Sequence, residues 1–319
     1  MTMRLALGIQ SPHLPPNGCV ATIGNFDGVH LGHRTVIDRL VEEGKRLGLP
    51  VCVVLFEPQP REFFDPCNAP PRLMRLREKI DRLSELPVEY ALILRFNRRM
   101  ATMPPEAFVQ DILIDALKIK FLVVGDDFRF GRRREGDFRL LQTFGALAGF
   151  ELADTPSVVI DNERISSTLI REALQSGDLG RASRLLGKPY EICGRIIHGQ
   201  KLGRQIGFPT ANLLMQRKNT PVQGVFAVTM RGLGEHPLAG VANVGIRPTV
   251  TGDETMLLET QLLDFDGDIY GRRVEVEFHQ KLRDERRFTG IPELSAQIRQ
   301  DITAARDFFA DHSRQSHQP

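Results

Sequence analysis

Cysteine is scarce in this chain: there are four among 319 residues, and no two are spaced as Cys-x-x-Cys. The absence of this motif argues against a zinc ribbon, and it neither favours nor disfavours disulfides. A reducing cytoplasm is therefore the simplest setting. A large excess of one charge is also missing, because 42 basic and 40 acidic side chains leave a net charge of only +2. Bulk electrostatics therefore give no reason to expect a nucleic acid or a membrane as partner.

Long uncharged apolar segments are absent, and residues 1–16 contain no continuous apolar core of the kind found in signal peptides. We therefore expect a cytoplasmic protein that neither spans a membrane nor is secreted. Internal repeats and low-complexity segments are missing as well. With 41% hydrophobic and 26% charged residues, the chain has the composition of an ordinary globular protein, and its length suffices for two domains.

The first half of the chain alternates short apolar runs with helical periods, which is typical of βα units that form a parallel sheet covered by helices. The carboxyl edge of such a sheet is expected to carry the site. A further loop followed by a helix is predicted at 165–174, and another helix at Asp178–Leu186. The alternation is carried by Cys19–Ile23, Thr35–Leu47, Val51–Phe56, Glu106–Leu117 and Phe121–Gly125.

After Gly187-Lys188-Pro189 the pattern changes to short strands divided by Gly, Pro and Asp, which predicts an all-β second domain, a small barrel. Strict alternation within the last strand predicts one wet face. A C-terminal helix is then expected to pack an apolar stripe on the barrel, through Ile291, Leu294, Ile298, Ile302 and Phe309. The predicted strands are Glu191–Ile197, Gly224–Met230, Leu238–Val244, Met256–Leu263 and Arg273–Phe278.

The most informative stretch is Gly24–His33, which follows the apolar run Cys19–Ile23 and opens a helical pattern. Its histidines, His30 and His33, flank a glycine at a strand-to-helix turn. Imidazole donors, a close backbone approach and a helix N-terminus converge there on the place that a phosphate would occupy. Taken alone, a His-x-Gly-His sequence fits a structural histidine pair as well as a functional one.

A second candidate is Ile165–Arg171, where three consecutive hydroxyls precede a helical pattern and Arg171 adds a planar charged fork. On its own such a sequence is more often only a helix cap. Both segments are expected at the carboxyl edge of one sheet, so we interpret them together as one cradle for a nucleoside triphosphate. The three hydroxyls belong to Ser166, Ser167 and Thr168.

This combination suits nucleotidyl transfer, in which a substrate phosphate attacks the α-phosphorus of ATP and pyrophosphate leaves. His30 and His33 would serve the transferring phosphate, and the hydroxyls with Arg171 would hold the leaving pyrophosphate, with Mg²⁺ on the triphosphate. The chain contains neither a Walker-type Gly-x-x-x-x-Gly-Lys-Ser/Thr loop nor Gly-x-Gly-x-x-Gly, which disfavours a P-loop kinase and a dinucleotide-dependent dehydrogenase.

Several long motifs in the right order make the chain resemble the nucleotidylyltransferase superfamily and, more narrowly, the bacterial bifunctional riboflavin kinase/FMN adenylyltransferases, also called FAD synthetases. The resemblance runs from about Gly18 to Asp301. It implies two reactions that consume ATP, phosphorylation of riboflavin to FMN and adenylylation of FMN to FAD. The matching segments are Gly24–His33, Phe56–Pro60, Val124–Gly131, Ile165–Arg171, Gly199–Asn212, Gly240–Val250 and Glu259–Gly271.

The fold that this resemblance implies is α/β. An N-terminal Rossmann-like nucleotidylyltransferase domain with a parallel sheet is expected over 1–186, and a small β-barrel riboflavin kinase domain with a C-terminal helix over 187–312. The tail, 313–319, is expected to be disordered. The expected partners are small-molecule substrates, namely riboflavin, FMN and ATP, and the sequence sets no oligomeric state.

In the N-terminal domain the resemblance implies a flavin pocket lined by Phe56, Pro58, Asp127 and Phe128. A flat aromatic ligand needs apolar faces with a few polar edges, although each phenylalanine could equally belong to the core. Relatives often carry Asn at Asp127, and many have His where this chain has Gln59. The implied ATP-binding residues are Gly24, Asn25, Phe26, Asp27, Gly32, Ser166, Ser167 and Thr168.

In the second domain the resemblance assigns Thr210 and Asn212 to Mg²⁺, which prefers hard oxygen ligands. Glu259 is the implied general base, which would take the proton of the riboflavin 5′-hydroxyl during attack on the γ-phosphorus. Gln261 stands nearby where many relatives carry His. The implied ATP-binding residues of this domain are Lys201 and three glycines, Gly199, Gly203 and Gly207. Glycines let the backbone approach the nucleotide, although the same spacing fits β-turns equally well.

Other interpretations stay open at this point. Arg129–Asp137 has the look of a basic aromatic patch for RNA, but its acidic neighbours dilute the charge, and we interpret it as a mobile loop over substrate phosphates. One alternative is a single-activity nucleotidylyltransferase for another phosphate ester, in which the barrel has no catalytic role. The intact Pro209–Asn212 and Glu259 argue against it. An idle flavin- or RNA-binding regulator would not need His30, His33 and Arg171.

Overall fold

A computed structural model describes residues 2–125, 127–155, 158–160, 162–199, 207–217, 219–248 and 254–315. The chain divides into two compact units. The first unit holds Met1–Pro70 and Met74–Ser166, and the second holds Pro71–Leu73 and Ser167–Pro319. A short segment near residue 72 therefore belongs with the C-terminal half of the chain.

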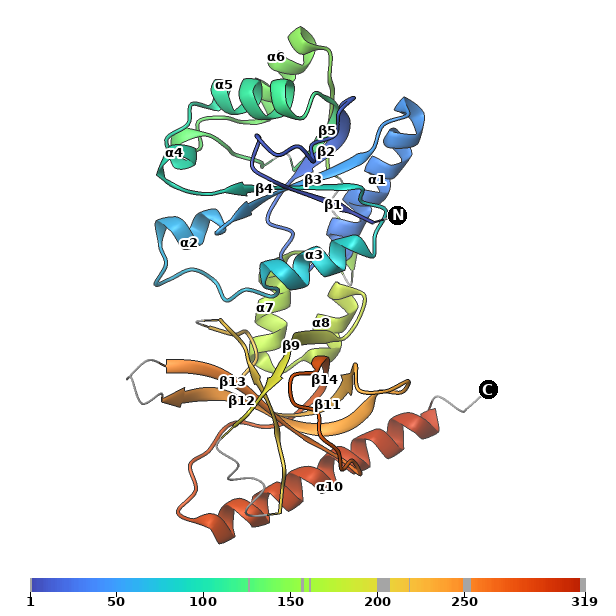
Figure 1. The fold of residues 1–319 in the computed structure, drawn as a ribbon, viewed down its shortest axis with the longest axis vertical. Coiled ribbons are helices and arrows are strands. Elements are labelled where there is room, and N and C mark those ends of the chain that lie inside the picture. Colours follow the sequence, from blue (N-terminus) through green and yellow to red (C-terminus); the bar gives the residue numbers. More distant parts are fainter. Residues whose placement is uncertain are drawn as a thin grey trace. The chain divides into compact units, whose positions relative to one another are not determined.

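The first unit is built on a sheet of six parallel strands in the order β1-β4-β3-β2-β5-β6 (Figure 1). Every residue of β2 is buried, because a central parallel strand is covered on both faces. Parallel pairing also brings the carboxyl ends of β2, β3 and β5 to one edge. The strands are β1 Arg4–Leu7, β2 Cys19–Ile23, β3 Val51–Glu57, β4 Tyr90–Arg95, β5 Ile119–Val124 and β6 Glu151–Asp154.

Helices cover both faces of this sheet, and successive residues of β2 and β3 alternate between two buried clusters. One cluster includes α1 and α3, and the other includes the π-helical segment η1 and α6 (Figure 1). A two-stranded hairpin, β7 Val159–Ile160 with β8 Glu163–Arg164, follows the sheet. The helices are α1 Leu31–Leu47, α2 Pro60–Phe64, α3 Leu76–Ser84, α4 Arg98–Ala101, α5 Pro105–Ala107, η1 Phe108–Ala116, the 3₁₀ turn η2 Arg132–Arg134 and α6 Phe138–Ala148.

The second unit contains two helices followed by a closed antiparallel barrel in the order β10-β13-β12-β11-β14-β9. The predicted α/β sheet and small barrel are therefore confirmed. The helices are α7 Ser167–Ser176 and α8 Leu179–Leu186. The barrel strands are β9 Tyr190–Ile197, β10 Ala211–Leu214, β11 Gly224–Arg231, β12 Leu238–Pro248, β13 Glu254–Leu262 and β14 Arg273–Arg283.

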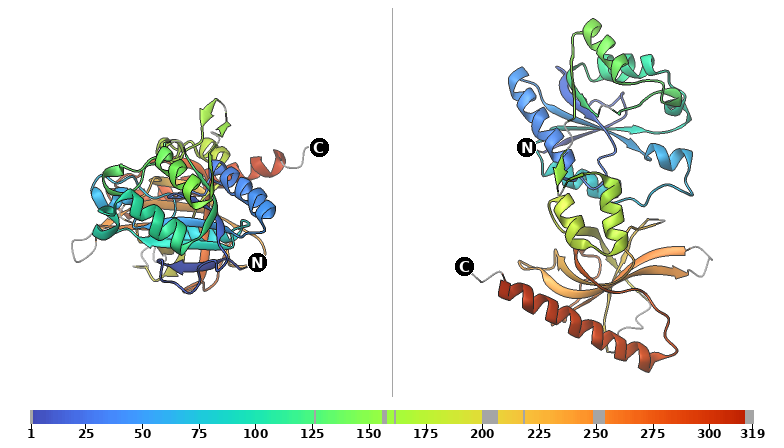
Figure 2. Two further views of the ribbon diagram at one scale, coloured as in Figure 1. Left: turned by 90° about the horizontal axis from the view of Figure 1, so that it is seen from above. Right: turned by 180° about the vertical axis from the view of Figure 1, so that it is seen from behind.

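Helix α10, Ile291–Gln315, lies across the barrel, as the C-terminal stripe predicts (Figure 2). It is also tied to β14 by a bidentate ion pair, in which Arg283 Nε and Nη2 lie 2.9 and 2.8 Å from the Asp301 carboxylate. The prediction is wrong for Ile291, the first residue of the stripe, because its side chain is exposed at the start of the helix. The residues that pack together are Val225, Ala227 and Val241 of the barrel and Ile302, Ala305, Phe308 and Phe309 of the helix.

The strand β14 confirms the predicted wet face, since Arg273 and Glu275 are exposed and Glu277 is half-buried, whereas the residues between them and Phe278 are buried. All four cysteines are free thiols. No helix among the described residues is both long and apolar enough to cross a membrane. Helix α10 continues to Gln315, so it enters the segment 313–319 that is predicted to be disordered; residues 316–319 lie outside the described residues.

Candidate active sites

The histidine loop joins β2 to α1 by a tightly bent backbone. Three of its residues have left-handed backbone conformations, with φ of 47° at Phe26, 91° at Gly28 and 42° at Val29. Such angles are unfavourable for side chains with a Cβ, so the loop is held by its surroundings. His30 is the N-cap of α1, and its Nδ1 accepts a hydrogen bond of 3.3 Å from the backbone N–H of His33.

The two imidazoles form a stack at the start of α1. The ring centroids of His30 and His33 are 3.6 Å apart with planes 15° from parallel, and the other face of the pair is extended by Phe26, 4.6 Å from His33. His33 Nδ1 is buried and has no hydrogen-bond partner among the described residues. Burial lowers the pKa of His33 well below its ordinary value, and the charges of His30 and Lys79 lower it further. His33 is therefore a neutral imidazole, a hydrogen-bonding group rather than a cation.

Neighbours of the stack fix its position. A Cβ at Gly32 would lie 3.2 Å from His30 Nδ1, so the glycine allows the His30 ring to occupy its place. Asp27 is buried and its carboxylate accepts a hydrogen bond of 3.0 Å from the N–H of Met74, which anchors the loop to the approach of α3. Lys79 of α3 is completely buried. Nothing in the sequence distinguishes Lys79 from a surface residue, because a lysine in an amphipathic helix ordinarily faces solvent.

The depressed pKa of His33 makes a prediction for stability. Because the unfolded chain binds this proton near pH 6.5 and the folded chain does not, the free energy of unfolding should fall as pH drops below about 6.5. One such proton contributes a slope of at most about 1.4 kcal/mol per pH unit. Urea unfolding at pH 7.5 and 6.0 measures this slope. His33→Gln should flatten it, and an unchanged slope in that variant would contradict the assignment.

A cavity of about 730 Å³ opens beside this loop and is lined by the loop residues Gly24 and Asn25. Three of the predicted flavin residues line it too: Phe56, Asp127 and Phe128. Its walls are aromatic, with Phe56 edge-on to Phe96 at 5.7 Å and Phe128 stacked on Phe130 at 5.5 Å. Such walls suit a flat aromatic ligand.

The fourth predicted flavin residue, Pro58, does not line this cavity. It follows Glu57 through a cis peptide bond and precedes the buried Gln59. Gln59 caps α2, and its backbone N–H donates a hydrogen bond of 2.9 Å to the Glu62 carboxylate. Gln59 therefore shapes the turn at the end of β3, and a flavin contact of Pro58 stays a prediction.

The hydroxyl segment crosses the limit between the two compact units. Ser166 is the last residue of the first unit, whereas Ser167 and Thr168 open α7 in the second. Arg171 is partly committed to structure, because its Nε donates a hydrogen bond of 2.7 Å to the Pro71 carbonyl within the second unit. The common cradle of histidines and hydroxyls stays a prediction.

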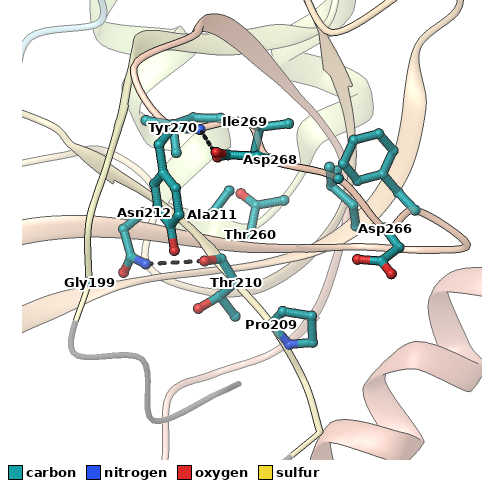
Figure 3. Close-up of a pocket in the computed structure, with 14 residues that line it drawn as sticks. Gly199, Pro209, Thr210, Ala211, Asn212, Thr260, Asp266, Asp268, Ile269 and Tyr270 are labelled. Atoms are coloured by element: carbon teal, nitrogen blue, oxygen red, sulfur yellow. Dashed lines mark hydrogen bonds between the residues drawn. The ribbon is translucent and has the colours of Figure 1, made fainter. Parts of the chain in front are cut away.

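A second cavity, of about 360 Å³, opens in the barrel unit beside the predicted metal ligands (Figure 3). Gly199, Thr210 and Asn212 line it, as does Thr260, to which no motif in the sequence points. Tyr270 lines the cavity as well, and its ring is drawn next to Asn212 (Figure 3). The centroid of this ring lies 3.8 Å from that of the His198 ring, and the Tyr270 backbone N–H donates a hydrogen bond of 3.1 Å to the Asp268 carboxylate. Gly207, which lies two residues before the lining residue Pro209 in the chain, has a φ of +86°. The predicted ATP residues Lys201 and Gly203 lie outside the described residues.

Asn212 presents an oxygen to this cavity. Its Nδ2 donates a hydrogen bond of 3.2 Å to the Thr210 carbonyl, which fixes the carboxamide (Figure 3). Its Oδ1 is buried without a hydrogen-bond partner among the described residues, and so is the Thr260 hydroxyl. An unused, buried oxygen beside the Thr210 hydroxyl fits a hard cation such as Mg²⁺ that brings its own phosphate and water ligands. The described residues contain no cluster of three His, Cys, Asp or Glu side chains that could hold a metal alone.

Glu259 is placed by the barrel register. It lies directly opposite Asn212 of β10 on one side and opposite Asn243 of β12 on the other. Directly paired residues share a face of the sheet, with Cβ atoms about 5 Å apart. The side chains of Glu259 and Asn212 therefore leave neighbouring strands on the same face, although Glu259 does not itself line the 360 Å³ cavity. No sequence motif points to Asn243, because only the strand register places it next to Glu259.

Gly199 offers a test of the carboxamide position. A Cβ at this residue would overlap the Asn212 side chain, whose Cγ would be only 2.7 Å away. We expect Gly199→Ala to displace Asn212 and to lower riboflavin phosphorylation by roughly tenfold to a hundredfold, the effect of about 1.4 to 2.7 kcal/mol on a barrier. Gly234→Ala is the matched control, because that Cβ would meet no atom within 4 Å. Equal activity of the two variants in a kinase assay would refute this role.

Comparison with known proteins matches the two halves of the chain to two different families. Residues 13–169 match the family described as FAD synthetase, and residues 186–309 match riboflavin kinase. A bifunctional riboflavin kinase/FMN adenylyltransferase of Escherichia coli K12 is 52% identical over 308 residues, 96% of this chain and 98% of its own length. The corresponding protein of Haemophilus influenzae is 48% identical over 96% of this chain and 99% of its own.

A solved structure from Streptococcus pneumoniae, described as a macrolide-efflux protein, is 28% identical and superposes with a TM-score of 0.78 over 95% of this chain and 98% of its own. The two family matches and the full-length relatives establish what the motifs suggest. The chain belongs to the family of bifunctional riboflavin kinase/FMN adenylyltransferases.

Proposed function

We propose that this protein phosphorylates riboflavin to FMN in its barrel unit and adenylylates FMN to FAD in its parallel-sheet unit, consuming one ATP in each reaction. The observation that carries the proposal is that each unit matches one half of the family and contains its own cavity beside the corresponding motif. We place the functional limit between residues 186 and 187, with the tail beyond residue 312 outside both activities. Both reactions take place on soluble small molecules, in keeping with a cytoplasmic enzyme.

Adenylyl transfer needs positioning more than covalent help. An oxygen of the FMN phosphate attacks the α-phosphorus of ATP, the bond from that phosphorus to the bridging oxygen breaks, and pyrophosphate leaves. In our proposal the neutral His33 and its partner His30 hydrogen-bond the oxygens on which charge accumulates. The loop Gly24 to Asp27 and Gly32 border the nucleotide. The segment Ser166, Ser167, Thr168 and Arg171 holds the leaving pyrophosphate.

The flavin substrate is proposed to occupy the 730 Å³ cavity. Phe56 and Phe128 offer apolar faces for the ring system, and Asp127 offers a polar edge. Gly24 and Asn25 border the same cavity, so a ligand within it lies next to the nucleotide loop. This adjacency supports a common site for FMN and ATP.

Riboflavin phosphorylation is proposed at the row formed by Asn212 and Glu259. The riboflavin 5′-hydroxyl attacks the γ-phosphorus of ATP, its proton passes to the Glu259 carboxylate, and ADP leaves. Thr210 and Asn212 would hold Mg²⁺, which screens the charge of the triphosphate when bound. Gly199, Lys201, Gly203 and Gly207 are proposed to border the nucleotide.

Supplying each flavin separately tests this proposal. With riboflavin, ATP and Mg²⁺, the protein should release ADP in a one-to-one ratio with the riboflavin consumed during the first turnovers. With FMN instead, it should release pyrophosphate in a one-to-one ratio with FAD, and no ADP. Removing Mg²⁺ with a chelator should stop both. Release of pyrophosphate without any FAD would indicate a different phosphate ester as substrate.

A further inference from the structure

The flavin cavity of the first unit has more positive charge at its edge than an uncharged ring system requires. Four arginines and two aspartates line it. The arginines are Arg61, Arg129, Arg133 and Arg134. Because the remaining walls are largely aromatic, the charge points to a ligand with a flat apolar body and an anionic group.

Arg133 and Arg134 lie next to each other on the η2 turn. Like Arg61, they form no hydrogen bond or ion pair through their side chains with any described residue, whereas Arg129 donates a hydrogen bond to the Phe128 carbonyl. The preceding residue, Arg132, differs from them because its guanidinium forms an ion pair of 3.5 Å with the Glu135 carboxylate. Arg132 does not line the cavity. The short η2 turn thus sends one arginine to a local carboxylate and two to the cavity.

The backbone that presents them is strained. Arg133 and Arg134 have φ of 54° and 60°, in the left-handed region that side chains with a Cβ rarely adopt. The segment is held on both sides of this strain, because Arg132 N–H donates 2.7 Å to the Met103 carbonyl, and Phe130 pairs with Gly136 through hydrogen bonds of 3.1 and 3.0 Å. Strain that the surroundings maintain is typical of functional positions.

We propose that Arg133 and Arg134 bind the phosphomonoester of the flavin substrate and so select FMN over riboflavin for adenylylation. The inference rests on the proposed function of this unit. Phe56 and Phe128 contact a ring system that both flavins share, so these walls do not distinguish them. Only the phosphate differs, and a guanidinium fork matches its oxygens in charge and geometry.

The test uses Arg133→Gly and Arg134→Ala, with Arg132→Ala as matched control. Glycine at 133 removes the guanidinium and also relieves the left-handed backbone, so loss of folding does not explain its effect. Each variant should raise the KM for FMN in FAD formation by roughly tenfold to a hundredfold, as expected for a lost charge-assisted hydrogen bond. The inhibition constant of riboflavin as a competitor of FMN should stay unchanged, and so should riboflavin phosphorylation and the KM of Arg132→Ala.

Two results would overturn the inference. An unchanged KM for FMN in both variants would show that the arginines do not contact the substrate. An equal loss of affinity for FMN and riboflavin would show that they shape the cavity without reading the phosphate. FAD formation by the unaltered protein separates the two proposals: its absence would overturn the proposed function together with this inference, whereas FAD formation with unchanged KM values would overturn this inference alone.

Discussion

His33→Ala should lower the rate of FMN adenylylation by about two to four orders of magnitude while riboflavin is still phosphorylated, so that FMN accumulates. The neutral imidazole is prepared for hydrogen bonding by burial, by its stack with His30 and by the charge of Lys79. Alanine leaves the triphosphate without that donor at the place where charge develops. Chromatography of the flavins after incubation with riboflavin, ATP and Mg²⁺ measures both steps at once.

His30→Ala should have the same consequence for FAD formation, with an additional cost to folding of about 1 kcal/mol, because His30 also caps α1. His13→Ala is the matched control, since His13 is exposed in the same unit and distant in sequence from the loop. Loss of FMN and FAD together in the His33 variant, with the control intact, would contradict separate sites.

Glu259→Gln should produce the opposite phenotype. The amide keeps the size of the side chain opposite Asn212 and removes the proton acceptor, so riboflavin phosphorylation should fall by about two to four orders of magnitude. FMN that is supplied directly should still be converted to FAD at the normal rate. The measurement is the initial rate of each half-reaction, with ADP and pyrophosphate followed separately.

Glu275→Gln on β14 controls for the loss of a carboxylate from the barrel, because Glu275 lies on its exposed face. A kinase rate that survives Glu259→Gln would remove Glu259 from the proton transfer. A fall in FMN adenylylation equal to the fall in phosphorylation would mean that the barrel is not an independent kinase.

Much of the fold could be predicted where one local signal was strong. The largely apolar run Cys19–Ile23, followed by a glycine-rich turn, defined β2 and the start of α1, although His30 places that start at Leu31 rather than Thr35. The helix expected at Glu106–Leu117 is instead divided into α5 and the π-helical η1, because hydrophobic periodicity does not distinguish helix types. The strand β4 was missed, since a short apolar run fits a strand or a buried helix equally.

The site was less predictable, because its residues come together through tertiary contacts. No local pattern shows that Glu259 pairs with Asn212 and Asn243; this depends on the register of the closed barrel. Lys79 has the sequence appearance of a surface lysine and is fully buried. Arg133 and Arg134 belonged to a run that resembled an RNA-binding patch, and the backbone directs both of them to the 730 Å³ cavity.

A mixture of two variants, each lacking one activity, tests most directly whether each unit performs its own half of the chemistry. His33→Ala alone should stop at FMN, and Glu259→Gln alone should leave riboflavin unchanged. Combined in equal amounts with riboflavin, ATP and Mg²⁺, the two should produce FAD, because FMN released by the first variant is a substrate for the second. A mixture that yields FMN but no FAD, while Glu259→Gln converts added FMN, would contradict this account.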